Sequence, residues 1–286
     1  MVFSKLDVGL LLFLMNVLSK GGANMTLIMT ADEAYANSAY IPDGESYFAR
    51  WSCQAAAFRR SHIDAELGVS YGTGARQNYD IFYPSNIARG TMIFVHGGYW
   101  LASSSRDFSH LALGAVTAGY ACAMPSYTLA PDGRIADITR DIEAAIGTIA
   151  QSTMGPIYLV GHSAGGYLVA RMACVDMAAD WSHRVARIMA ISPISDLLPL
   201  IETSMNTTLR IDVAEALAES PIHFAPQNMA VTAWVGGEER PAFLDQAQWL
   251  SAAWNCDLTV EAGKHHFNVI EGLETPLSAM MRALLR

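Results

Sequence analysis

Short apolar runs alternate with longer amphipathic stretches along most of the chain. The short runs predict strands at 79–84, 91–96, 120–127, 156–162, 185–192, 230–236 and 256–262. Between them, apolar residues recur at helical spacing in FSHLALGAVTAG, IADITRDIEAAIGTIA, AGGYLVARMACVDM, PAFLDQAQWLSAAW and ETPLSAMMRALLR. The later strands are almost wholly apolar, as in a parallel sheet that is covered on both faces. The pattern therefore predicts an α/β fold with a doubly wound, mostly parallel sheet.

The same pattern outlines the domain organisation. We expect residues 31–286 to form a single α/β domain, beginning with helical material over 31–66. Residues 195–224 lie between two predicted strands and look like two short helices. Ligands of open α/β sheets bind beyond the carboxyl ends of the strands, so this insertion is a candidate lid.

Residues 1–30 are expected to be an N-terminal extension that need not belong to the folded domain. The apolar stretch VGLLLFLMNVL at 8–18 is too short to span a bilayer, although a signal peptide could have such a core. Asp7 interrupts the positive flank of a signal peptide, and GGANMT offers no convincing cleavage site. These features favour a cytoplasmic protein over an exported one and leave export open.

Composition excludes several kinds of site. The net charge of −9 leaves no basic patch for a nucleic acid, so none is expected as a partner. The four cysteines are far apart and form no CxxC pair, which predicts free thiols and no metal site. Apolar residues make up 52% of the chain, enough for a sizeable core, and no segment after the first 30 residues predicts a membrane span. No cofactor is expected.

The sequence GHSAGG at 161–166 carries the strongest chemical signal. It fits the G-x-S-x-G pattern, follows a predicted strand and precedes a predicted helix. Gly161 and Gly165 leave room for a tight turn that exposes the hydroxyl of Ser163. A glycine-rich turn alone would be unremarkable chemically, but this context predicts that Ser163 is a nucleophile.

A serine nucleophile needs a base, and the base needs an acid to orient it. In this arrangement the acid and then the histidine follow the serine along the chain. His265 and His266 follow the last strand, and His266 is preferred because Phe267 directs that segment inward. His223 lies in the insertion and is expected at the surface.

The acid should follow the preceding strand, where the loop reads GGEERPAFLDQ. Glu238 and Glu239 both stand there, and Asp245 lies further into the next helix. Pro241 suits the first turn of that helix and places Glu239 just before it, so Glu239 is preferred while Glu238 remains open.

A glycine pair follows the strand at 91–96, in the sequence HGGYW. The oxyanion of an acyl-transfer intermediate needs preorganised N–H donors, and an HGGG-type loop supplies one of them. Gly97 and Gly98 fit this role together with the N–H of Ala164, the residue after the nucleophile. His96 is expected to brace the loop.

HGGYW departs from HGGG, and here the chain resembles the kynurenine formamidase (arylformamidase) group of α/β-hydrolases, whose loop reads HGG-x-W. The resemblance also covers AYANSAYIP, YDIFYP, SYTLAP, GHSAGG, the insertion SPISDLLPLIETSMNTTLRI and HHFNVIEGL. It implies an α/β-hydrolase fold. The acid of that group lies in G-x-x-acid-x-P-x-F, which here selects Glu239, and its base precedes a phenylalanine, which selects His266. The group more often has Asp at the acid position.

The resemblance implies a serine hydrolase that cleaves the formamide bond of an N-formyl arylamine such as N-formylkynurenine and releases formate. A formyl group is small, so specificity should come from the aryl side, with Tyr99, Trp100 and Tyr127 as candidate walls. Core packing beneath the loop is an equal alternative for Trp100. Arg106 and Arg210 are the nearest candidates to bind the amino-acid end of kynurenine.

Other functions remain open at this stage. The alternatives are a carboxylesterase, another small-acyl amidase on the same triad, or a catalytically inactive α/β-hydrolase used for binding. The expected partner is a small-molecule aryl formamide or ester, with no nucleic acid and no membrane, and a homodimer is left open.

Overall fold

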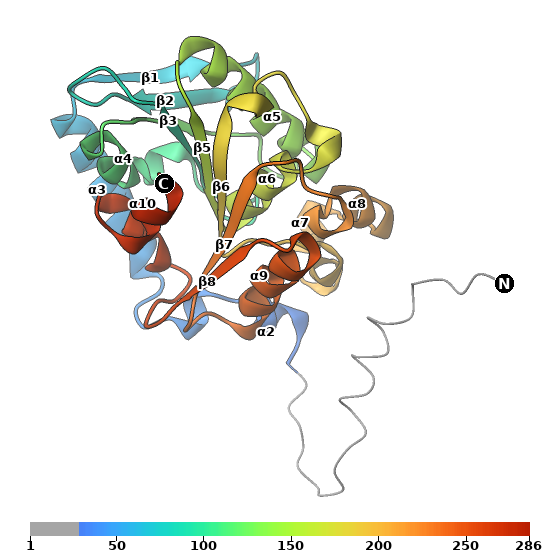
Figure 1. Cartoon of the computed structure of the whole chain (residues 1–286). Coiled ribbons are helices and arrows are strands. Elements are labelled where there is room, and N and C mark those ends of the chain that lie inside the picture. The colour runs from blue at the N-terminus through green and yellow to red at the C-terminus, as the bar shows by residue number, and fades with distance from the viewer. Residues whose placement is uncertain (1–28) are drawn as a thin grey trace, which may run out of the picture. The chain divides into compact units, whose positions relative to one another are not determined.

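An eight-stranded sheet forms the centre of the computed structural model, which describes residues 29–286 (Figure 1). Its strand order is β1-β2-β4-β3-β5-β6-β7-β8. The strands are β1 (Ala65–Ser70), β2 (Asn78–Phe82), β3 (Thr91–Val95), β4 (Ala121–Pro125), β5 (Ile157–His162), β6 (Val185–Ile191), β7 (Ala230–Gly236) and β8 (Asp257–Glu261). Strand β2 runs antiparallel to both β1 and β4, whereas all pairs from β4 to β8 are parallel.

Helices cover both faces of the sheet. In Figure 1, α3 (Ser46–Ser61), α4 (Leu113–Thr117) and α10 (Ala279–Leu284) lie to the left. To the right lie α5 (Ile135–Ser152), α6 (Ala164–Met172) and α9 (Pro241–Trp254). Alternate side chains of β3 point into the two cores: Ile93 and Val95 join the core under α5 and α6, and Met92 and Phe94 join the other. Burial on both faces explains why these strands are apolar throughout.

The structure confirms the predicted fold class, a doubly wound and mostly parallel sheet. All seven predicted strands are present, and helix α9 has the predicted bounds. Strand β1 was not predicted, because most of its side chains are exposed and its residues do not alternate regularly. Gly68 lies within a register shift of β1, and its N–H donates to the buried Asp80 over 2.7 Å.

Two further observations concern the state of the cysteines and the possibility of a membrane span. Residues 31–286 form one compact unit, in which all four cysteines are free thiols. Among residues 29–286, no helix combines the length and apolar character that crossing a membrane requires. The apolar stretch at 8–18 lies outside the described residues.

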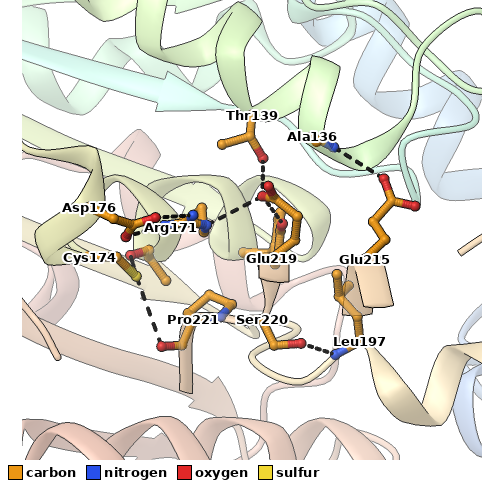
Figure 2. Close-up of polar contacts among 12 residues, drawn as sticks. Ala136, Thr139, Arg171, Cys174, Asp176, Leu197, Glu215, Glu219, Ser220 and Pro221 are labelled. Carbon is orange, nitrogen blue, oxygen red and sulfur yellow. Dashed lines mark hydrogen bonds and ion pairs between the residues drawn. The ribbon is translucent and has the colours of Figure 1, made fainter. Parts of the chain in front are cut away.

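The insertion at 195–224 contains two short helices, α7 (Asn206–Leu209) and α8 (Val213–Glu219), as predicted. Figure 2 shows how polar contacts attach α8 to its neighbours. The carboxylate of Glu219 accepts hydrogen bonds from Thr139 of α5 and from Tyr167 and Arg171 of α6, at 3.1 to 3.3 Å. Glu215 forms an ion pair with Arg134 at the start of α5. Helix α8 is therefore anchored to the helix that follows the predicted nucleophile.

Two helical glycines differ sharply in the space around them, which yields a stability prediction. A Cβ on Gly165 would lie 2.0 Å from the carbonyl oxygen of Val95, whereas a Cβ on Gly147 would lie 3.6 Å from its nearest side-chain neighbour, Trp181. Gly165→Ala should lower the free energy of unfolding by at least about 2 kcal/mol, because backbone must move to admit the methyl group. Gly147→Ala should be neutral or raise it by up to about 1 kcal/mol, as expected for a helix interior.

Chemical denaturation of both variants, followed by circular dichroism, measures the difference. Equal stability of the two variants would contradict the close packing of α6 against β3.

Candidate active site

The turn between β5 and α6 holds Ser163 in a strained conformation. Its backbone has φ 56° and ψ −118°, and its N–H donates to the carbonyl of Ile191 over 2.8 Å. A Cβ on Gly161 would lie 2.1 Å from the carbonyl oxygen of Gly165. The glycines on both sides are thus required for the turn to close, and strain of this kind is typical of functional positions.

His266 and Glu239 form a buried pair. His266 Nδ1 lies 2.6 Å from Glu239 Oε2, and the two residues are only 3% and 7% exposed. Because the carboxylate accepts, Nδ1 carries the hydrogen and Nε2 keeps its lone pair. The ring is held by Phe243, whose centroid is 4.2 Å away, and both His266 and Ser163 line the same cavity.

The other oxygen of Glu239 is also fixed. Oε1 accepts from the hydroxyl of Ser192 over 2.5 Å and from the N–H of Gly236 over 2.8 Å. Glu238, the alternative acid, is exposed. Ser192 was not predicted from the sequence, although it directly follows the buried strand β6, where functional side chains of such sheets gather.

His265 has a different environment from His266. Its Nδ1 accepts from the N–H groups of Phe267 and Asn268, so Nε2 carries the hydrogen and donates to the hydroxyl of Tyr47 over 3.2 Å. This half-buried ring braces the loop and cannot serve as the base in this position.

The HGGYW loop turns through left-handed backbone. Gly98, Tyr99 and Trp100 have φ of 110°, 53° and 57°, and the N–H of Leu101 returns to the carbonyl of Gly98 over 2.9 Å. Gly97 and Gly98 line the cavity, and a Cβ on Gly97 would lie 3.0 Å from Ser163 Cβ. The backbone of this loop therefore runs directly beside the serine. Ala164 begins α6, where the N–H groups of the first turn have no acceptor within the helix.

His96 braces this loop from below. Its Nδ1–H donates to the carbonyl of Gly97 over 2.7 Å, and its ring stacks on Tyr127 at 4.3 Å between centroids. Complete burial lowers the pKa of His96 to about 4, so the ring is neutral.

The three aromatic residues that were predicted to line the pocket lie in different environments. Tyr99 lines the cavity, as expected. Trp100 and Tyr127 do not: both are fully buried, Trp100 edge-on to Tyr167 at 5.1 Å, and Tyr127 donating its hydroxyl to the carbonyl of His96. The prediction that they wall the pocket is wrong, and for Trp100 the alternative of core packing holds. The left-handed turn directs Trp100 away from the side of Tyr99, whereas Tyr127, which follows β4, packs against the buried ring of His96.

The cavity above the serine measures about 600 Å³. Much of its wall comes from the N-terminal segment, which sequence analysis did not assign to the site. Of the insertion, only Ser204 and Met205 contribute. The aromatic residues that line the cavity are Tyr35, Phe48, Trp51, Tyr99, Phe108 and Phe267. The segment AYANSAYIP, which carries part of the family resemblance, was the one signal for this wall.

Tyr99 joins the loop to that wall. Its hydroxyl donates to the carbonyl of Tyr35 in helix α2 (Ala31–Tyr35) and accepts from Asn37 Nδ2 over 3.1 Å. Gln246 in turn donates to the hydroxyl of Tyr35 over 2.8 Å. Burial raises the pKa of Tyr99, which keeps the phenol protonated and able to donate.

The charged side chains that line the cavity are acidic. Among the described residues that line it, Asp32 and Glu45 are the acids and there is no Lys or Arg. The expectation for Arg106 and Arg210 is therefore wrong: Arg106 pairs with Asp80, and Arg210 donates to the carbonyl of Pro131. Within residues 29–286, no group of three or more potential ligands could hold a metal ion.

The sequence profile of the α/β-hydrolase fold matches residues 92–236, just over half of the chain. The chain belongs to the α/β-hydrolase family. The match spans strands β3 to β7, including the HGG loop and the nucleophile turn. It confirms the predicted family fold and makes the protein a hydrolase.

Individual relatives agree with this fold. Kynurenine formamidases from Salmo salar and Danio rerio are 28% and 27% identical to this α/β-hydrolase, covering 72% and 79% of the chain and 76% and 83% of the relatives. A candidate thioesterase from a Silicibacter species has a crystal structure with a TM-score of 0.87 and 47% identity, covering 90% of this chain and 100% of its own. Esterase B from Lactobacillus rhamnosis, at 20% identity and 84% and 94% coverage, has a TM-score of 0.64. The chain is thus a kynurenine formamidase-like α/β-hydrolase.

The two neighbouring glutamates give a matched pair of variants. Glu239→Gln should lower kcat/KM on an activated aryl ester by about 1,000-fold or more, because an amide no longer fixes the imidazole tautomer. Glu238→Gln should stay within about threefold of the unmodified enzyme, since that side chain is exposed. Steady-state kinetics of both variants test this prediction. A larger loss of kcat/KM in Glu238→Gln than in Glu239→Gln would identify Glu238 as the acid instead.

Proposed function

We propose that this α/β-hydrolase is a serine hydrolase that cleaves the formamide bond of N-formyl arylamines. In this proposal Ser163 is the nucleophile, His266 the general base and acid, and Glu239 the orienting acid. The observation that carries it is the convergence of Ser163, the imidazole held by Glu239 and the HGG backbone on one cavity. The reaction needs water and no cofactor.

In the first half-reaction, the hydroxyl oxygen of Ser163 bonds to the formyl carbon while His266 Nε2 takes its proton. The carbonyl oxygen becomes an oxyanion beside the N–H groups of Gly98 and Ala164, and Gly97 shapes the loop. The C–N bond then breaks as imidazolium His266 returns the proton to the departing arylamine. Glu239 stabilises the imidazolium charge throughout.

In the second half-reaction, water replaces the amine. His266 removes a proton from this water as its oxygen bonds to the formyl carbon of the formyl-serine. Collapse of the second oxyanion breaks the bond to Ser163 Oγ, which recovers its proton from His266. Formate leaves, and the enzyme returns to its starting state.

Two features support an aryl formamide as substrate. The kynurenine formamidases of fish match most of this chain, and the cavity carries six aromatic side chains that suit an aryl leaving group.

Hydrolysis of esters or thioesters is the second candidate. The Silicibacter protein, a candidate thioesterase, shares 47% of its residues with this chain, and a serine triad accepts several leaving groups. Comparing leaving groups with one acyl group separates the two functions.

Replacing the proposed nucleophile tests the mechanism. Ser163→Ala should lower formate release from formanilide by about 10,000-fold or more, because the covalent route is lost. Ser152→Ala, at the exposed end of α5, is the matched control and should retain full activity. Phenyl formate, acetanilide, p-nitrophenyl acetate and an acyl thioester complete the panel. If esters or thioesters exceed formanilide by orders of magnitude in kcat/KM, the formamidase proposal fails.

The acidic lining predicts how substrate charge affects the rate. N-formylkynurenine carries a carboxylate that has no cation among the described lining residues, whereas its decarboxylated analogue N-formylkynuramine presents only an ammonium group to Asp32 and Glu45. We expect kcat/KM to favour the analogue by about fivefold, the scale of an exposed ion pair. The Asp32→Asn, Glu45→Gln double variant should remove this preference, and a preference for N-formylkynurenine in the unmodified enzyme would contradict it.

A further inference from the structure

His162 stands between the proposed nucleophile and base and has no part in the reaction described above. It is the last residue of β5 and directly precedes Ser163. Its ring lies 4.7 Å from that of His266 between centroids, is almost fully buried and lines the cavity. Each ring nitrogen of a histidine in this position is expected to have a hydrogen-bond partner.

Hydrogen bonding fixes the tautomer of His162. Its Nε2 lies 2.8 Å from the backbone carbonyl oxygen of His266, and a carbonyl can only accept. Nε2 therefore carries the hydrogen. Burial and the neighbouring His266 lower the pKa of His162 well below its usual value, so the ring is neutral and Nδ1 holds a bare lone pair.

Nδ1 lies beside the reacting centre. A Cβ built on Gly97 would be 3.4 Å from this nitrogen and 3.0 Å from Ser163 Cβ, so all three meet at one wall of the cavity. No described residue donates to Nδ1, and the atom is open to the cavity that His162 lines. A substrate that fills this part of the cavity displaces water from Nδ1, so it must offer a donor of its own or leave the acceptor unpaired.

Formamides and esters differ in this respect. A secondary formamide brings an N–H on the scissile bond, while an ester has only an oxygen there. We propose that Nδ1 of His162 accepts a hydrogen bond from the N–H of the scissile formamide, an inference that rests on the formamidase function proposed above. His162 is then a substrate-binding residue that favours amides over esters.

The hydrogen bond matters most as the tetrahedral intermediate breaks down. When Ser163 Oγ bonds to the formyl carbon, the nitrogen loses conjugation, becomes pyramidal and develops a lone pair. Holding its N–H toward His162 directs that lone pair away from His162 and leaves it free to take the proton from His266. As the nitrogen takes that proton it gains positive charge and its N–H becomes a stronger donor, so the contact strengthens in the transition state of C–N cleavage and raises its rate. His162 itself gains and loses no proton.

The variant His162→Gln separates this role from a structural one. The glutamine side-chain amide can still donate to the carbonyl of His266, but it provides no lone pair at the position of Nδ1. Formanilide and phenyl formate share the formyl and phenyl groups and differ only in the N–H or O of the scissile bond. We expect kcat/KM on formanilide to fall about 30-fold, while that on phenyl formate changes by less than about threefold.

His265→Gln is the matched control. It alters another histidine, the one that precedes His266 in the loop after β8, without removing an acceptor from the cavity, so it should change both substrates by the same factor. Equal losses on both substrates in His162→Gln would overturn the proposal and leave His162 as a support for His266.

N-methylformanilide, which has no N–H, gives a second measurement. The ratio of kcat/KM for formanilide to that for N-methylformanilide should be high in the unmodified enzyme and fall at least about tenfold in His162→Gln. An unchanged ratio would overturn the N–H contact even if the variant is less stable. If the unmodified enzyme releases no formate from formanilide, the formamidase function fails and this inference fails with it. Formanilide turnover with equal losses on amide and ester overturns only the role of His162.

Discussion

The site depends on the close backbone contact between the start of α6 and the end of β3. The Cα of Gly165 packs so tightly against the carbonyl of Val95 that no side chain fits between them. This contact draws the nucleophile turn against the strand whose next residues are the HGG loop. Without it, Ser163 and the Gly97 backbone would not share one wall of the cavity. Two segments far apart in sequence thus meet because Gly165 carries no Cβ where it touches the carbonyl of Val95.

A second set of contacts fixes the aromatic wall of the cavity. The phenol of Tyr99 ties the HGG loop to α2, and Gln246 ties α2 to the first residues of the insertion through hydrogen bonds to Tyr35 and to the N–H of Ser195. The N-terminal helices, the loop and the insertion are therefore linked through polar atoms that are almost completely buried. Since each link is a hydrogen bond of defined geometry, the aromatic wall has a fixed position relative to the serine.

The sequence predicts the sheet well because strands buried on both faces must be apolar, as β3 and β5 are. It also places the serine, because only glycines allow the turn that Gly161 and Gly165 flank. The same reasoning fails for Trp100 and Tyr127, because an aromatic residue has the same identity whether it faces a cavity or the core. The left-handed backbone decides the position of Trp100, and packing against His96 decides that of Tyr127. The wall formed by Phe48 and Trp51 could not be found from periodicity, because its position depends on tertiary contacts. Ser192 could not be predicted, because a single serine after a strand forms no recognisable sequence motif.

The proposed acid, Glu239, is one methylene longer than an aspartate would be at the same position. An extra methylene adds a rotatable bond, so the carboxylate of Glu239 would sweep a wider volume unless it were held. The hydroxyl of Ser192 and the N–H of Gly236 both donate hydrogen bonds to the carboxylate oxygen that does not face His266. Residue 192 and the length of the acid are therefore coupled: shortening the acid withdraws the carboxylate from these donors, and they would in turn lose the acceptor that now satisfies them. The length of the side chain at position 239 is in this way tied to a residue 47 positions away in sequence.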